Sequence, residues 1–365
     1  MIVSCVAGFA SIQDQEQPIR ILSAFFHTGK MPHAMLFTGV DGIGKRSAAT
    51  AFAMACNCTG DKVSIEAESS CTGSMPGNAA KVPAVCGRCR SCRKIQADSH
   101  PDIIRIEPAG QYIRIAQIRE LLGTLAMKPY EAKLRVVIIS DAHAMNPEAG
   151  NALLKILEEP PESTILILTA SGTADLLPTI VSRCQQIRFN PLPLKRLAAL
   201  LVEKEGVTPE NARVLAAMAD GSYSRALRLY RQGWIERRRW LMDAGGFLMG
   251  ASPGRVTMTG LMALALELLE KKNGIGDALE ILTSFYRDLA VLKFRRGRII
   301  NEDLSDRLHA AAGALSGTSL VANLEAIETT RKQLRGNANP RLAIELLLMQ
   351  LTDHLPSISG RAGSV

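Results

Sequence analysis

Apolar and polar positions follow two different patterns along the chain, and the change falls at about residue 190. Before it, short apolar runs of strand length are separated by stretches with a helical period, the order of elements in a parallel sheet flanked by helices. Strands are predicted near residues 35–38, 102–106, 134–140, 164–169 and 186–189. Residues 1–190 therefore predict one α/β domain.

One helix between these strands carries clear start and stop signals. Asn146 can cap its first turn, and Pro147 suits its first helical position. Pro160 and Pro161 stop the helix after Glu159. The helix is therefore predicted to contain residues 151–155, Asn-Ala-Leu-Leu-Lys.

Beyond residue 193 the pattern is helical throughout and no strand signal follows. Apolar residues recur at helical spacing over 197–205, 209–219 and 224–232. A hinge containing Gly and Pro is predicted at 245–254, and helical patterning continues as far as residue 355. We expect a small helical domain at 191–246 and an all-helical C-terminal domain at 255–357.

Composition limits the class of protein. With 365 residues, 47% of them hydrophobic, each predicted domain can bury a core. The apolar stretches end well before the ~20 residues of a membrane span, and residues 1–14 lack the pattern of a secretory signal. A cytoplasmic location without disulfides is expected.

The charge balance is basic, with a formal net charge of +8. This excess would assist contact with a polyanion but does not establish one. Two basic clusters, at 237–239 and 293–298, lie in helical segments. We expect each to be an ordinary solvated helix face, with a phosphate-binding track as the alternative.

A glycine-rich turn follows the first predicted strand. Gly39, Gly42 and Gly44 lead into Lys45 and Arg46, which fits the phosphate-binding pattern Gly-x4-Gly-Lys except at its final position. The glycines would let backbone N–H groups converge on phosphate, and Lys45 would reach the terminal phosphates. Arg46 replaces the hydroxyl that holds Mg²⁺. We expect an ancestral nucleotide site, with a purely structural turn as the alternative, and present-day binding of ATP and Mg²⁺ is not the expectation.

The acidic element that accompanies such a loop is also incomplete. The apolar run at 136–139 leads into Ser140, Asp141 and Ala142. In one register Ser140 takes the place of the metal-holding Asp and Asp141 that of the catalytic Glu. In the other, Asp141 is the metal ligand and Ala142 takes the place of the Glu. Either register lacks a carboxylate, and an Asp after a strand can also be a cap or a turn residue. Efficient ATP hydrolysis by this chain alone is therefore not expected.

Three of the eight cysteines are closely spaced, at Cys86, Cys89 and Cys92. Thiolates at this spacing fold around one soft cation, most often tetrahedral Zn²⁺. An iron–sulfur cluster of the bacterial ferredoxin kind would need a Cys and a Pro where Gln96 and Ala97 stand. Zinc is favoured, in a structural role.

The fourth metal ligand is left open by the spacing. Cys56, Cys58 and Cys71 are the candidates, and a stretch rich in Gly, Ser, Ala and Pro at 59–85 separates the first two from the cysteine triplet. This stretch is predicted to be an insertion in the α/β domain.

Several phrases together resemble the clamp-loader branch of the AAA+ ATPases over at least residues 11–230. They are the phosphate loop, the cysteine module inserted after its helix, the segment Asn151–Pro161 (Asn-Ala-Leu-Leu-Lys-Ile-Leu-Glu-Glu-Pro-Pro) and the segment Leu177–Cys184, which ends in Ser-Arg-Cys. The resemblance implies an AAA+ domain at 1–190 with a zinc module at 58–92. It also implies that 191–246 is the lid domain and 255–357 the oligomerisation collar.

The resemblance assigns roles to single residues. Arg183 would be an arginine finger that reaches the γ-phosphate of ATP in an adjacent subunit, where a guanidinium stabilises charge on the transferring phosphoryl group. An isolated Arg at a helix end would otherwise make only a dipole contact. Cys58 would be the first zinc ligand, although the insertion before Cys86 is longer than is usual in the family. Thr169 would match the first sensor, or is simply a strand threonine.

The second-domain sensor departs from the family's pattern. Active relatives carry an Arg at the position that matches Ser224, and Arg225 is one residue, or ~100° of helix, out of place. The motor subunits of the family, called gamma or tau, need the phosphate-loop hydroxyl and the paired carboxylates, whereas its stator-type subunits commonly lack part of this set and keep Ser-Arg-Cys. This chain matches the second description.

The resemblance implies a place in a pentameric ring beside gamma/tau ATPase subunits and a delta subunit. The assembly would open the sliding clamp and place it on primer-template DNA. Two rivals remain: a motor subunit that hydrolyses ATP itself, and a zinc-dependent nucleic-acid-binding module acting alone.

Overall fold

A five-stranded sheet forms the centre of the first of two units in the computed structural model, which describes residues 8–12, 14–60, 85–244, 257–271, 274–294 and 297–353. All pairings are parallel, in the order β2-β3-β4-β1-β5. The strands are β1 (Ala34–Thr38), β2 (Ile103–Ile106), β3 (Arg135–Ile139), β4 (Thr164–Ala170) and β5 (Gln185–Arg188). All five predicted strands are confirmed, with their ends shifted by at most one residue.

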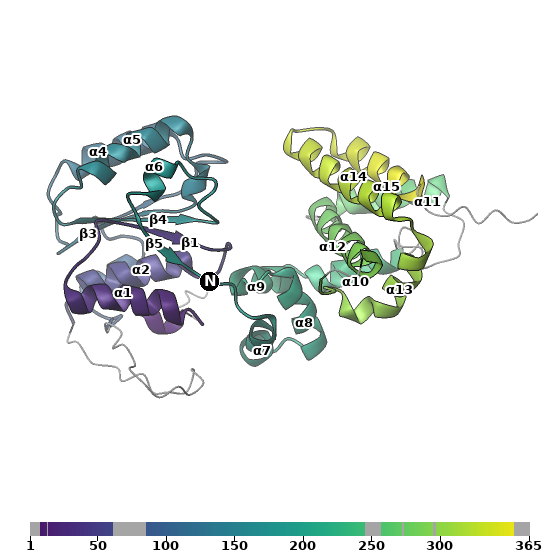
Figure 1. Ribbon diagram of the computed structural model, residues 1–365, viewed down its shortest axis with the longest axis horizontal. Coiled ribbons are helices and arrows are strands. Elements are labelled where there is room, and N and C mark those ends of the chain that lie inside the picture. Colours follow the sequence, from purple (N-terminus) through teal and green to yellow (C-terminus); the bar gives the residue numbers. More distant parts are fainter. Residues whose placement is uncertain are drawn as a thin grey trace, which may run out of the picture. The chain divides into compact units, whose positions relative to one another are not determined.

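Helices cover both faces of the sheet (Figure 1). Val136 and Ile138 of β3 pack into one core cluster, and Val137 and Ile139 pack into the other. Successive strand side chains point to opposite faces, so a run that is apolar at every position is buried on both sides. One face carries α1 (Glu16–Thr28), α2 (Lys45–Asn57) and α3 (Arg90–Gln96), and the other carries α4 (Ile115–Leu125), α5 (Pro147–Glu158) and α6 (Pro178–Val181).

The helix with predicted start and stop signals is α5. The side chain of Asn146 accepts a hydrogen bond from the backbone N–H of Ala149 at 3.0 Å, and Pro147 opens the helix. The helix ends at Glu158, one residue before the predicted stop. The local prediction is confirmed because caps and prolines act within one turn of the backbone.

Helix α2 runs from the carboxyl end of the sheet to its amino end. It begins at Lys45, beyond the carboxyl end of β1, and ends at Asn57. The side chain of Asn57 donates to the carbonyl of Leu134 at 2.9 Å and accepts from its N–H at 3.1 Å, next to the amino end of β3. The phosphate loop and the cysteine-bearing segment therefore lie at opposite ends of one helix.

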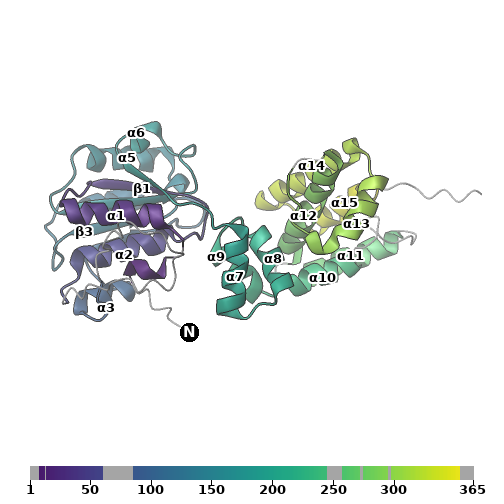
Figure 2. The ribbon, with the colours of Figure 1, turned by 60° about the horizontal axis from the view of Figure 1, so that its bottom comes forward.

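The described secondary-structure elements of the second unit are all helices (Figure 2). Helix α12 packs against α13 and α14, and α15 packs against α11 and α14. The bounds are α7 (Leu194–Glu205), α8 (Pro209–Met218), α9 (Tyr223–Arg231), α10 (Trp234–Ala244), α11 (Met258–Glu270), α12 (Gly274–Phe294), α13 (Ser305–Ala314), α14 (Gly317–Arg335) and α15 (Pro340–Asp353). None of the described helices has the length and apolar character of a membrane span.

The predicted domain boundaries are not settled by this division. The first unit comprises Met1–Pro193 with Gly221–Ser224, and the second comprises Leu194–Asp220 with Arg225–Val365. Residues 191–246 and 255–357 thus fall largely within one unit, and the hinge predicted at 245–254 lies outside the described residues. The three-domain division stays a prediction.

The expectation of a solvated face fails at Arg238 in the first basic cluster. Arg238 on α10 is only 6% exposed. Its guanidinium donates to Asn301 at 2.8 Å and to both carboxylate oxygens of Asp303 at 2.8 and 2.9 Å. A long cation is buried here because a carboxylate and an amide satisfy its donors.

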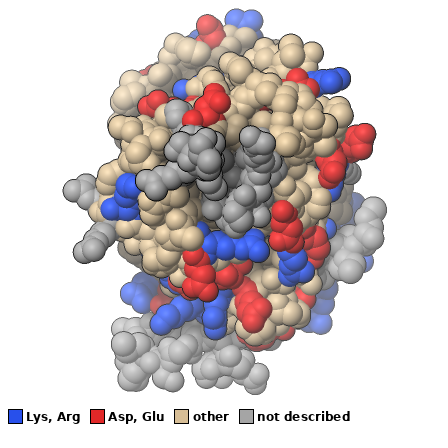
Figure 3. Space-filling view, turned by 90° about the vertical axis from the view of Figure 1, so that its right-hand side faces the viewer, with Lys and Arg blue, Asp and Glu red and all other residues tan. Residues whose placement is uncertain are grey.

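In the second cluster, Arg298 is exposed as expected and pairs with Glu302. Residues 295 and 296 of this cluster lie outside the described part of the chain. On the face drawn in Figure 3, acidic and basic side chains are interspersed, and the positive charge does not gather into one broad patch.

Candidate metal centre and phosphate loop

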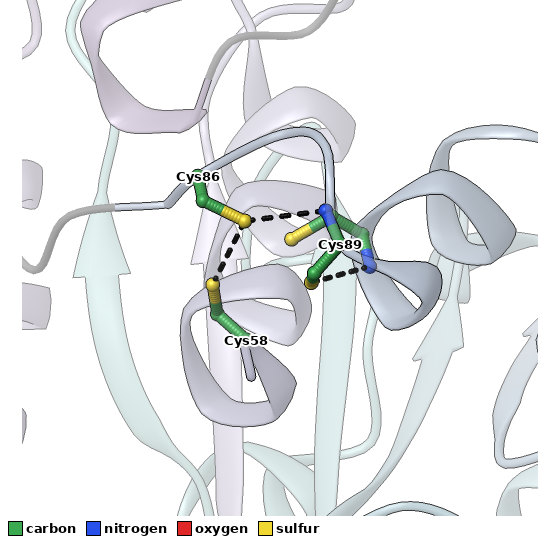
Figure 4. Close-up of side chains that lie close together, drawn as sticks. Cys58, Cys86 and Cys89 are labelled. Atoms are coloured by element: carbon green, nitrogen blue, oxygen red, sulfur yellow. Dashed lines mark hydrogen bonds between the residues drawn. The ribbon is translucent and has the colours of Figure 1, made fainter. Parts of the chain in front are cut away.

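Four cysteines converge beside the end of α2. Cys58 follows that helix directly, and Cys86 and Cys89 precede α3 (Figure 4). Cys92 lies in the first turn of α3. Their sulfur atoms all lie within 4.8 Å of one another, and those of Cys58 and Cys86 are 3.5 Å apart. Sulfurs bound to one tetrahedral Zn²⁺ at ~2.3 Å stand about 3.8 Å from each other. The cluster could therefore hold one metal ion, and an all-sulfur set of four suits structural zinc.

The geometry selects among the candidate fourth ligands. Cys58 lies in the cluster, whereas Cys56 does not. Burial raises the pKa of the Cys56 thiol to about 12, which keeps that side chain an uncharged core group. Cys71 lies outside the described residues.

Backbone N–H groups prepare two of the sulfurs for the thiolate form. Burial raises the pKa of Cys89, but the N–H groups of Cys92 and Thr59 outweigh it and hold the pKa at about 5. At Cys86, burial is likewise outweighed by the N–H groups of Arg88 and Cys89, and the pKa is lowered. Such N–H donors stabilise the anionic sulfur that a metal binds.

Gly60 is a further member of this site that the sequence analysis did not single out. A Cβ atom added there would lie 2.6 Å from the sulfur of Cys86. The chain leaving Cys58 can pass this sulfur only without a side chain. The local signal was weak, because the glycine opens a segment already rich in Gly and Ser.

The phosphate loop has the expected backbone, but its lysine contacts the loop itself. Gly39, Gly42 and Gly44 all have positive φ angles, of 146°, 74° and 108°. At Gly39 a Cβ would also lie 2.5 Å from the carbonyl oxygen of Phe189. The loop therefore needs glycine to adopt its turns and to approach the end of β5.

Lys45 is 5% exposed and its ammonium lies against its own loop. It donates to the carbonyls of Gly39 and Val40, at 3.0 Å for Val40, and approaches the carboxylate of Asp41 at 3.4 Å. Burial lowers the pKa of Lys45, and the nearby Asp41 partly offsets this. Arg46, about half exposed, forms an ion pair with Glu107.

Asp141 and Thr169 meet at the carboxyl ends of β3 and β4. The backbone N–H of Asp141 donates to the hydroxyl of Thr169 at 3.2 Å, and Asp141 has a positive φ of 52°. Asp141 also lies close enough to Lys45 to interact with its charge. Ser140 and Ala142 are both buried and carry no carboxylate. Asp141 is therefore the carboxylate that this segment brings to the loop. The sensor role of Thr169 stays a prediction, since its observed contact is also that of a structural strand threonine.

Arg183 lies just beyond α6, and its side chain is 37% exposed. The guanidinium pairs with Glu158 at 2.8 Å and donates to the carbonyl of Thr179 at 3.1 Å. Cys184, beside it, is buried, which raises the pKa of its thiol to about 12. The arginine is thus held at the surface by a carboxylate from α5 and a carbonyl from α6.

At the predicted sensor of the second domain, Ser224 and Arg225 make different contacts. The backbone N–H of Ser224 approaches the carbonyl of Gly42 at 3.4 Å. Arg225 pairs with Asp220 at 3.0 Å and with Glu280 at 2.5 Å. Its guanidinium is committed to carboxylates of the second unit.

Comparison with known proteins gives the family. The family described as "DNA polymerase III, delta subunit" matches residues 14–193, and the one described as "DNA polymerase III, delta subunit, C terminal" matches residues 257–353. Together they cover more than half of the chain. The chain belongs to the clamp-loader subunits of DNA polymerase III.

Two kinds of clamp-loader subunit are among its relatives. It is 27% identical to the delta' subunit of Bacillus subtilis over 93% of this chain and 96% of that protein. It is 36% identical to the delta' subunit of Pseudomonas aeruginosa over 58% of this chain and 60% of the relative. It is 28% identical to the gamma/tau subunit of Mycobacterium bovis over 97% of this chain but only 62% of the relative. Similarity therefore gives the family, and the site residues must distinguish the kinds of subunit.

Proposed function

We propose that the chain is the delta-prime, or stator, subunit of a bacterial clamp loader. It would help to load the sliding clamp onto primed DNA in the cytoplasm, beside gamma/tau ATPase subunits and a delta subunit. Arg183 would act in trans on ATP bound by the neighbouring motor subunit.

The surface position of Arg183 carries the proposal. Its guanidinium is partly exposed and held by Glu158 and Thr179, so it is oriented before any partner arrives. A pre-oriented guanidinium offers a fixed fork of donors to a transferring phosphoryl group. The proposal requires that Arg183 leave Glu158 or share its charge when the γ-phosphate is present.

The chain's own nucleotide loop supports the stator over the motor alternative. Lys45 contacts loop carbonyls, Arg46 pairs with Glu107, and Ser140 supplies no carboxylate. A motor that holds Mg²⁺ needs a hydroxyl and paired acidic groups at these places. The gamma/tau alternative rests on overall similarity alone.

The C-terminal helices support membership of a ring. Leu342 and Leu346, four residues apart on α15, are 64% and 50% exposed, and Leu266 on α11 is 43% exposed. Side chains at this spacing share one helix face. We assign this apolar face to contacts with other subunits in the collar, and the cysteine cluster to a structural Zn²⁺.

Steady-state ATP hydrolysis by the reconstituted loader, with clamp and primed DNA, tests the proposal. Arg183→Ala is expected to lower hydrolysis at the one ATP site that Arg183 serves by about 10³-fold or more, and total turnover by that site's share, while the assembly stays intact on gel filtration. Arg188→Ala, at an exposed arginine on the nearby strand β5, is the matched control and should leave turnover unchanged. Hydrolysis by the isolated chain that Lys45→Ala abolishes would establish a motor subunit instead.

The carboxylate beside the arginine gives a second test. Glu158→Gln keeps the side-chain shape but weakens the hold on Arg183. We expect a smaller loss of turnover than for Arg183→Ala, without loss of assembly. An effect on assembly alone would show that this ion pair serves the subunit contact and not the chemistry.

A further inference from the structure

A cavity in the second unit is lined by five arginines. Its volume is ≈ 580 Å³, within the range of small-molecule sites. The arginines come from helices α9, α12 and α14 and from the segment before α13; they are Arg225, Arg287, Arg298, Arg331 and Arg335. So many guanidiniums around one space repel each other unless negative charge lies among them.

The carboxylates in the cavity wall compensate one arginine. Asp220 and Glu280 are the acidic residues among the described lining, and both pair with Arg225, at 3.0 and 2.5 Å. The other four arginines have no carboxylate within the lining. The wall of the cavity therefore carries an excess of three positive charges.

The carboxylate partners of Arg287, Arg298 and Arg331 lie outside the cavity wall. Within the wall, Arg331 donates to the hydroxyl of Thr283 at 3.1 Å and Arg287 to the carbonyl of Arg298 at 3.2 Å. A guanidinium has five N–H donors, so these contacts leave donors available. Arg287 contacts Asp288 at 3.1 Å, but that buried carboxylate also accepts hydrogen bonds from the backbone N–H groups of Ile300 and Asn301. Its charge is thus shared among several donors.

Two further partners belong to exposed surface pairs. Arg298 and Glu302 are 57% and 54% exposed, and Arg331 and Glu328 are 31% and 47% exposed. Exposed pairs of this kind contribute only about 0–1 kcal/mol each. Arg335, also exposed, has no ion pair among the described residues. Replacing these weak ion pairs by contacts with a bound anion therefore costs little free energy.

The lining also indicates what kind of anion fits. Of the described lining residues, none is aromatic, so the cavity offers no stacking platform for a base. Guanidiniums bind phosphate oxygens through paired donors. We infer that this cavity binds consecutive phosphate groups of a nucleic-acid strand, without reading its bases.

This inference does not rest on the arginine-finger role. Every lining residue belongs to the second unit, whereas Arg183 and the phosphate loop belong to the first. Loss of phosphate binding at the cavity and loss of trans hydrolysis are therefore separable by mutation.

Fluorescence anisotropy of the full chain with a labelled single-stranded oligonucleotide of about 20 nucleotides tests the inference. The variant is Arg298→Gln/Arg335→Gln, because both side chains are exposed. The matched control is Arg239→Gln/Arg341→Gln, which removes the same charge from exposed arginines of the same unit outside the cavity. Circular dichroism confirms that both fold.

The expected result concerns salt dependence as well as affinity. The cavity variant should bind about tenfold more weakly, and the slope of log K against log salt should fall by about 1.4, as expected for two lost phosphate contacts to a single strand. The control should keep the wild-type slope. Equal losses in both variants, or no binding by the wild-type chain at low salt, would overturn the inference.

Two further probes distinguish the source of the anion. If inorganic tripolyphosphate binds through Arg298 and Arg335 while the oligonucleotide does not, the site takes a small polyphosphate and the strand assignment is wrong. If polyglutamate displaces the oligonucleotide with equal affinity, the cavity accepts acidic protein segments and phosphate is not its ligand.

Discussion

The two ends of the sheet in the first unit differ in how their charged and polar groups are used. At the amino end, Asp102 accepts three backbone N–H groups at 2.8 to 2.9 Å and faces Arg135, and Asn57 fixes the end of α2 beside the cysteines. At the carboxyl end, Lys45 contacts its own loop and Arg46 forms a surface ion pair. The amino end has four cysteines that could hold one metal ion, with supporting contacts around them, whereas the carboxyl end lacks the hydroxyl and the paired carboxylates of the phosphate-binding pattern.

This difference teaches which chemistry the chain needs. A structural metal requires all its ligands at once, because three thiolates without a fourth leave an open position. Under the proposed function, a subunit that lends an arginine to a neighbour would need the shape of the nucleotide fold, but not its metal-holding hydroxyl or its paired carboxylates. The comparison predicts large effects at the amino end and small ones at the phosphate loop.

The largest effect is expected at a cysteine. Cys89→Ser should reduce bound zinc from about one ion per chain to nearly none, because a hydroxyl is a poor replacement for a thiolate. Metal analysis of the purified chain measures this. Cys56→Ser, which changes a cysteine outside the cluster, is the control and should keep its zinc. Zinc loss in the control would place Cys56 among the ligands.

The next largest effect is expected at Asp102. Asp102→Ala leaves the buried Arg135 without its carboxylate and three N–H groups without an acceptor, and should lower the free energy of unfolding by about 3–5 kcal/mol. Urea denaturation measures it. Asp98→Asn, which neutralises a 56% exposed partner of Arg105 and tolerates the left-handed backbone at φ 54°, should change it by less than about 1 kcal/mol.

The same carboxylate predicts a pH dependence. Burial raises the pKa of Asp102, but its backbone N–H donors outweigh this and hold the pKa below the ordinary value. A depressed folded-state pKa stabilises the fold above the unfolded value of about 3.9, and this contribution is lost as the pH falls through the folded value. Below about pH 4 the wild-type chain should therefore lose stability more steeply than Asp102→Ala. Parallel pH profiles would show that Asp102 is not the titrating group.

A smaller effect is expected at Gly60. The added Cβ of Gly60→Ala would meet the sulfur of Cys86 at 2.6 Å, so the chain must shift and zinc affinity should fall by about 10- to 100-fold. Competition with a zinc chelator measures this. Gly123→Ala on α4, where a Cβ meets nothing within 4 Å, should leave zinc affinity unchanged.

The smallest effect is expected at Arg46. Arg46→Ser removes a half-exposed ion pair with Glu107 and should change the free energy of unfolding by less than about 1 kcal/mol. It should also fail to start ATP hydrolysis, because Ser140 still provides no carboxylate. Steady-state ATP turnover by this variant would contradict the comparison and show that one hydroxyl restores a working site.

Much of the fold could be predicted from sequence because its signals are local. The apolar runs of all five strands and the cap and prolines of α5 act within a few neighbouring residues. The solvated-face expectation failed at Arg238 because its partners Asn301 and Asp303 are more than 60 residues away. Neither periodicity nor composition carries information about such a contact.

The sequence by itself determined the parallel sheet, the cysteine triplet, the missing hydroxyl at Arg46 and the family phrase that contains Arg183. Tertiary structure decided that Cys58 and not Cys56 joins the cysteine cluster, that Lys45 contacts its own loop, and that five arginines surround one cavity. The physical reason is the range of the interactions. Backbone preferences and caps are set within one or two turns, whereas ligand sets and charge clusters form only where distant segments are packed together.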